Sequence, residues 1–178
     1  MKKLLTLALA TALCAPAIAQ KFGSTNEGAP TIKQSIEMGG KKMSLNYTAI
    51  TWADGKTMSR AMDKANGKGF REFINGSAPK SPLATFESSV DCKCGDLMLP
   101  AGEYKVFYTI TEDCDWQINF QKGDAKPQTM KLALTDNPME HKRLVMSLHA
   151  GDKGAGSYIG FGKKSCMLEF APAKKKAE

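Results

Sequence analysis

The sequence predicts an all-β protein, an antiparallel β-sandwich of the jelly-roll or immunoglobulin-like type with one short helix in a long connection. Apolar and polar residues alternate in short runs through the second half of the chain, which is typical of strands buried on one face. Turn-forming residues separate these runs at short intervals, as in sandwiches and barrels. Removing a leader of 19 residues from the 178 leaves 159, enough for one domain with its own core.

Residues 1–19 have the pattern of a secretory signal peptide. Two lysines precede an apolar run over residues 4–18, and Ala17-Ile18-Ala19 forms a small-residue cleavage site. The run is short for a membrane span, so we expect no transmembrane segment after cleavage near Gln20; an uncleaved anchor is the alternative. The sequence therefore predicts a periplasmic or secreted protein.

A flexible, polar lead-in is expected over residues 20–30, and the sandwich domain over residues 31–171. The domain opens with a predicted hairpin. Residues 32–38 form a strand-like run, and apolar residues alternate with polar ones over residues 43–49. Between them, Gly39-Gly40 supplies the positive φ that a tight turn requires.

The connection that follows the hairpin, residues 53–82, breaks the strand pattern. Met58 and Met62 stand at helical spacing and predict a short helix over residues 57–65, and a turn is expected at residues 70–74. Long excursions from a sheet often carry binding surfaces. The candidate ligand contacts on and beside this connection are Trp52, Phe70, Arg71 and Phe73.

The rest of the domain alternates with period two, and one face of each run is expected to point into the core. The inward residues are Phe86, Val90, Tyr104, Val106, Tyr108, Ile110, Trp116, Ile118, Phe120, Met130, Leu132, Leu134, Leu144, Met146, Leu148, Cys166, Leu168 and Phe170. Turns are expected at residues 99–102, 112–113, 122–124, 136–138 and 151–156.

Four cysteines remain after removal of the leader: Cys92, Cys94, Cys114 and Cys166. An even number in an exported chain predicts two disulfides, because the extracytoplasmic space is oxidising. A bond between Cys92 and Cys94 would be strained, so each is expected to pair with one of the other two. Which pairs with which stays open.

Charge is spread along the chain. The formal net charge is +7, which falls to +5 when Lys2 and Lys3 leave with the leader. Basic residues do not gather on one element, so the sequence predicts no nucleic-acid partner. The basic tail over residues 172–178 has no apolar anchor and is expected to be disordered.

One stretch, residues 95–120, has a more specific sequence pattern than the alternation seen elsewhere in the chain. Leu97-Met98-Leu99-Pro100-Ala101-Gly102-Glu103-Tyr104 leads into a strand, and an acidic turn then precedes Asp115-Trp116-Gln117-Ile118-Asn119-Phe120. This pattern resembles the bacterial exported family catalogued as domain of unknown function 2911. The resemblance implies a β-rich exported domain and no particular reaction. Where that family often has a Trp-Arg-Thr-Gly-type segment, this chain has residues 70–77, so no activity tied to the segment carries over.

The sequence shows no catalytic motif. His141 and His149 are the available imidazole bases, and Ser147 lies on the same predicted strand without an elbow motif around it. We therefore expect a non-enzymatic module without a cofactor, which binds a small ligand, a glycan or an envelope protein. An extracytoplasmic copper- or zinc-handling protein, with ligands from Cys92, Cys94, His141 and His149, is the alternative. A hydrolase-like enzyme is a further, less favoured one.

Overall fold

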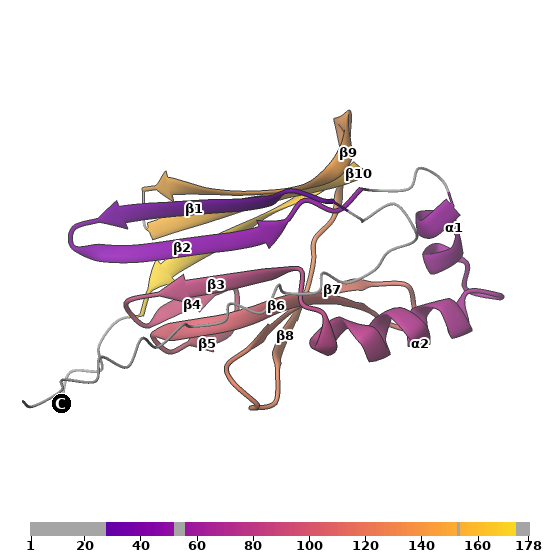
Figure 1. Cartoon of the computed structure of the whole chain (residues 1–178), viewed down its shortest axis with the longest axis horizontal. Helices are drawn as coiled ribbons and strands as arrows, with labels where there is room; N and C mark the ends of the chain where they lie inside the picture. Colours follow the sequence, from indigo (N-terminus) through magenta and orange to yellow (C-terminus); the bar gives the residue numbers. More distant parts are fainter. Residues whose placement is uncertain (1–27, 52–55, 153, 174–178) are drawn as a thin grey trace, which may run out of the picture.

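A computed structural model describes residues 28–51, 56–152 and 154–173. It contains two antiparallel sheets packed face to face, so the predicted all-β sandwich is confirmed (Figure 1). The predicted signal peptide, Trp52 and most of the predicted lead-in and tail lie outside the described residues. Among the described residues, no helix is long and apolar enough to span a membrane.

Over the described residues, the first sheet has six strands and the second has four. In spatial order, the first consists of β1 (Thr31–Met38), β2 (Lys41–Thr48), β3 (Ala84–Ser88), β6 (Gly102–Ile110), β7 (Trp116–Gln121) and β8 (Gln128–Lys131). The second consists of β5 (Leu97–Leu99), β4 (Cys92–Cys94), β10 (Gly154–Pro172) and β9 (Thr135–Gly151). The predicted opening hairpin is β1 and β2, joined at Gly39-Gly40, where both glycines have positive φ.

The connection between β2 and β3 contains more helix than predicted. The predicted helix is α1 (Lys56–Met62), and the predicted turn at residues 70–74 lies inside the ten-residue helix α2 (Lys68–Ser77), which is followed by the 3-10 turn η1 (Ala78–Lys80). Both helices lie at one end of the sandwich, opposite the β1–β2 turn (Figure 1). Arg71 and Ile74 share one buried face of α2, and this packing stabilises the helix despite its two glycines.

Aromatic rings from both sheets fill the core. The rings of Phe86 in β3 and Phe170 in β10 stack with centroids 4.6 Å apart, and Phe120 packs edge-on against both. The turn before β6 is tied to this core, because the Tyr104 hydroxyl donates a hydrogen bond to the carbonyl oxygen of Pro100. The Leu-Pro-Ala-Gly turn therefore fixes the start of β6.

One side of the sandwich is closed by hydrogen bonds between the two sheets. The side-chain amide of Gln34 in β1 donates to the Met146 carbonyl (3.0 Å) and accepts from the Leu148 amide (2.8 Å), both in β9. The Leu144 amide donates to the Ile50 carbonyl (2.8 Å) after β2. At the other side β8 faces β4 and β5, and side chains alone join the sheets there in the described part of the chain.

Strand β10 reverses direction near Gly162, which has φ +52°. The pairing of β10 with β9 shifts register on both sides of this glycine. The two ends of β10 consequently lie side by side, since a Cβ placed on Gly154 would be only 2.1 Å from the carbonyl oxygen of Phe170. The yellow part of β10 returns below its orange beginning (Figure 1). This reversal brings residues 154–156 next to residues 167–171.

Candidate functional site

The predicted ligand contacts on the connection do not form one site. The Arg71 side chain is 5% exposed, and its guanidinium donates to the carbonyl oxygens of Ala61 (3.1 Å) and Asp63 (2.8 Å), so it joins α2 to the end of α1. The Phe70 ring is half-buried against the core, with the Arg60 guanidinium 4.8 Å from its centroid. Of these three described residues, Phe73 is the one presented to solvent, with 63% of its surface exposed.

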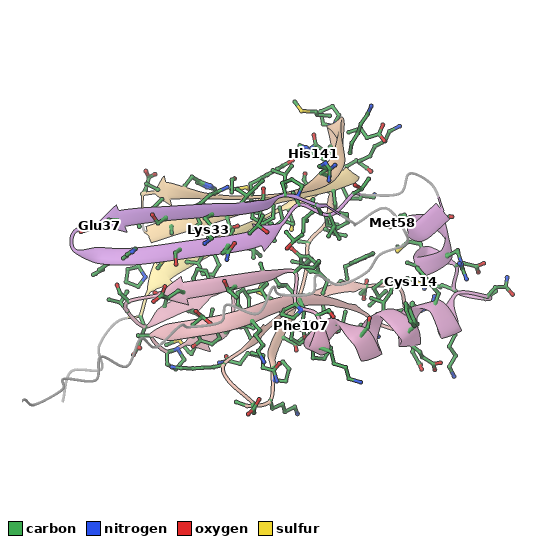
Figure 2. All side chains as sticks on the ribbon, viewed as in Figure 1. Lys33, Glu37, Met58, Phe107, Cys114 and His141 are labelled. Atoms are coloured by element: carbon green, nitrogen blue, oxygen red, sulfur yellow. The ribbon has the colours of Figure 1, made fainter. Side chains whose placement is uncertain are left out.

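The predicted disulfides are not formed. All four described cysteines are buried, unpaired thiols. Cys94 pairs with Phe170 in the sheet register, so Cys166 lies four residues further along β10, about 13 Å away at 3.3 Å per residue, which is too far for a disulfide. Cys114 lies at the helical end of the molecule (Figure 2), whereas β4 lies at the opposite end. The four thiols are therefore packed in the core as separate side chains.

The predicted metal ligands are separated as well. Cys92 and Cys94 point into the core, whereas His141 and His149 are only half-buried on β9. His141 lies on the projecting end of β9, as Figure 2 shows. Among the described residues, no group of three or more His, Cys, Asp and Glu side chains is placed to hold a metal ion. A shared site built from these four residues is thus not assembled.

His141 belongs instead to a hydrogen-bonded cluster with a tyrosine. Its Nε2 lies 2.7 Å from the Tyr158 hydroxyl and 3.1 Å from Nδ2 of Asn137, and the Asn137 amide also donates to Tyr158. Gly160 leaves room for both rings, because a Cβ there would be 2.6 Å from His141 and 2.9 Å from Tyr158. These hydrogen bonds join the start of β9 to β10, so the cluster has a structural role at the projecting end of β9.

His149 lines a groove on the outer face of the second sheet. The groove has a volume of about 350 Å³ and lies where β9 and both ends of β10 meet. Gly154 and Gly156 form its floor, and the side chains of His149, Asp152, Met167 and Glu169 surround it. Because Met167 and Glu169 alternate with the buried Cys166, Leu168 and Phe170, they necessarily point outward.

The position of the His149 imidazole depends on the glycine opposite it in the sheet. Gly156 is the register partner of His149, and a Cβ on Gly156 would be 2.2 Å from Nε2 of that histidine. The ring therefore lies across the neighbouring strand. Any side chain at position 156 would displace the ring from this strand.

A second cavity, of about 290 Å³, adjoins the groove. Met167, Glu169 and Ala171 line both, so this part of β10 forms the wall between them. The second cavity is also lined by Lys93 and Cys94 of β4 and by Met130 of β8. It thus reaches the inner side chains at the side of the sandwich where β8 faces β4.

Sequence reasoning missed Met167, Glu169 and the two floor glycines. The turn expected at residues 151–156 is confirmed only for the link between β9 and β10, because β10 begins at Gly154. A signal was present, because Gly154, Gly156, Gly160 and Gly162 recur at even positions and so share one strand face. That pattern indicates a strand with a bare outer face, over which neighbouring side chains can lie.

Comparison of the chain with protein-family models, with curated proteins and with solved structures finds no match. The resemblance to domain of unknown function 2911 stays a prediction.

Proposed function

We propose that the protein is an exported, non-enzymatic binding module whose small ligand occupies the groove on the outer face of β9 and β10. The observation that carries this proposal is the groove itself, about 350 Å³ in volume, which is in the range of small-molecule sites. Its lining combines the polar side chains of His149, Asp152 and Glu169 with small residues, Gly154 and Gly156 among them.

The lining favours a ligand with a cationic or hydrogen-bond-donating group. Asp152 and Glu169 supply carboxylates, which accept hydrogen bonds and attract positive charge. The His149 ring adds a further polar contact, and the Met167 thioether offers a flexible apolar one. An amine-bearing small molecule, or an amino sugar at the end of an envelope glycan, fits this combination.

A binding role is preferred over hydrolysis because of what surrounds His149. The described residues that line the groove include no serine, threonine or cysteine that could act as a nucleophile beside the imidazole. Ser147 is on the same strand two positions away, and its register partner is Tyr158, outside the lining. The proposal therefore assigns His149 to ligand contact.

The binding proposal is tested by NMR on the mature chain, residues 20–178, with glucosamine and cadaverine as amine probes and glucose as the uncharged control. Amide shifts should change at His149, Gly156 and Glu169, and Glu169→Gln should weaken binding. Glu103→Gln is the matched control, since Glu103 is exposed on β6 in the other sheet. Shifts confined to Phe73 and the rest of α2, or none for either amine, would refute the groove as the site.

Export is tested separately with the full chain. Cell fractionation followed by mass spectrometry of the intact protein should find it outside the cytoplasm with an N-terminus near Gln20. An uncleaved chain in the cytosol would remove the exported part of the proposal and leave the groove to be judged by itself.

A further inference from the structure

The groove on the outer face of β9 and β10 continues into the second cavity. The two spaces, of about 350 Å³ and 290 Å³, share Met167, Glu169 and Ala171 as lining residues. Met167 and Glu169 point outward from β10, because they alternate with buried residues. A ligand that enters the groove can therefore extend across this part of β10 into the second cavity.

The second cavity adds a cationic side chain, that of Lys93 in the middle of β4. Lys93 is exposed between the buried Cys92 and Cys94, so its side chain also points outward. In the sheet register it pairs with Ala171 of β10, and Glu169 lies two positions along the same face. Diagonal neighbours of this kind are about 7–8 Å apart. An ammonium group and a carboxylate group thus flank the wall between the two cavities.

The charges around the two cavities do not neutralise one another. Ion pairs form elsewhere on the surface, such as that between Lys164 and Asp136, whose Nζ and Oδ1 atoms are 2.8 Å apart. Within the part of the chain that the structure describes, Lys93, Asp152 and Glu169 form no ion pair. All three side chains are exposed. Each is therefore open to a charged group of a ligand.

We propose that the ligand is a short zwitterion that spans both cavities, with its ammonium group between Asp152 and Glu169 and its carboxylate on Lys93. This inference rests on the binding role proposed for the groove and narrows its ligand class to molecules with an amine and a carboxylate at opposite ends of a short chain. Charge-assisted hydrogen bonds hold the two ends. The Met167 thioether, in the wall between them, supplies an adaptable apolar contact for the chain.

Lys93 is expected to set selectivity more than overall affinity. An ion pair with an exposed side chain is weak, because water and salt screen it. The gain from one such pair corresponds to about two- to fivefold in affinity. A ligand with the amine alone loses this gain and occupies the groove without reaching the second cavity.

The test compares pentylamine with 5-aminopentanoate in NMR titrations of the mature chain at low ionic strength. Both probes have the same number of carbon atoms, and they differ in the terminal carboxylate. The wild-type protein should bind 5-aminopentanoate about two- to fivefold more tightly, with additional amide shifts at Lys93 and Gly95. In Lys93→Gln the two probes should bind equally, and the affinity for pentylamine should stay as in the wild type. Lys105→Gln is the matched control, since Lys105 is exposed on β6 in the other sheet.

The outcomes separate this inference from the proposed function. Equal affinity of the wild type for the two probes, with shifts confined to the groove, would overturn the zwitterion and leave the amine site in place. A preference for 5-aminopentanoate that Lys105→Gln also removes would overturn it as well, because net charge would then be the cause. Absence of binding by either probe would overturn both proposals. Misfolding does not confuse the result, since Lys93 is exposed and its replacement leaves the core unchanged.

Discussion

Replacing Gly154 with alanine tests the reversal of β10, on which the groove depends. A Cβ at this position would lie 2.1 Å from the Phe170 carbonyl oxygen and 3.2 Å from the Ala171 Cα, whereas real Cβ atoms stay beyond 3.0 Å. One backbone segment must therefore move by about 1 Å in a packed sheet. Overpacking of this kind costs about 1–3 kcal/mol, offset by about 0.4–1 kcal/mol from the stiffer unfolded chain. We expect a net loss of about 1–2 kcal/mol.

Gly156→Ala is the matched control, two positions along the same segment. Its Cβ would meet only the ring of His149, which can rotate away, so the free energy of unfolding should change by less than about 0.5 kcal/mol. Urea unfolding followed by tryptophan fluorescence measures both variants, with Trp116 buried in the core as a reporter. Equal stability of the two variants would refute the reversal of β10 and the groove built on it.

Three further outcomes follow from other parts of the fold. Arg71→Met should lower the free energy of unfolding by about 2 kcal/mol, because two hydrogen bonds from a buried cation are lost, and calorimetry that found no loss would contradict its structural role. Gly76→Ala should raise stability by about 0.4–1 kcal/mol, since this exposed position in α2 has open space for a methyl group; a lower melting temperature would count against the helix. Burial, with a smaller contribution from Cys166, raises the pKa of Tyr108 above its ordinary 10.0, so the unfolded chain loses this proton first and stability falls as the pH rises above about 10. The decline between pH 10 and 11, measured by chemical unfolding, should be shallower in Tyr108→Phe, and an identical decline would show that the phenol does not contribute.

Alternation predicted the core well. Tyr104, Trp116, Phe120 and Leu168 are all buried as expected, because each strand has one face on the core and period two identifies that face directly. The sequence did not predict α2, because the glycines at residues 69 and 76 are unfavourable in a helix. Tertiary packing stabilises this helix in spite of them.

The candidate site depends on contacts between residues that are far apart in the sequence, and the sequence pattern does not reveal such contacts. The groove exists because Gly162 reverses β10 and places residues 154–156 beside residues 167–171. The disulfide prediction was wrong for a similar reason, since cysteine count says nothing of the register that keeps Cys94 apart from Cys166. The alternation predicts that residues such as Glu169 point outward, but only the fold shows that they line a common cavity.

The groove as the binding site is tested most directly by amide shift mapping of wild-type and Gly156→Ala proteins with the same amine probe. We expect shifts at His149, Gly156 and Glu169 in the wild type. In Gly156→Ala, which keeps the fold but displaces the His149 ring from the groove lining, these shifts should disappear. Undiminished binding by Gly156→Ala, or shifts elsewhere on the molecule, would rule out the groove as the binding site.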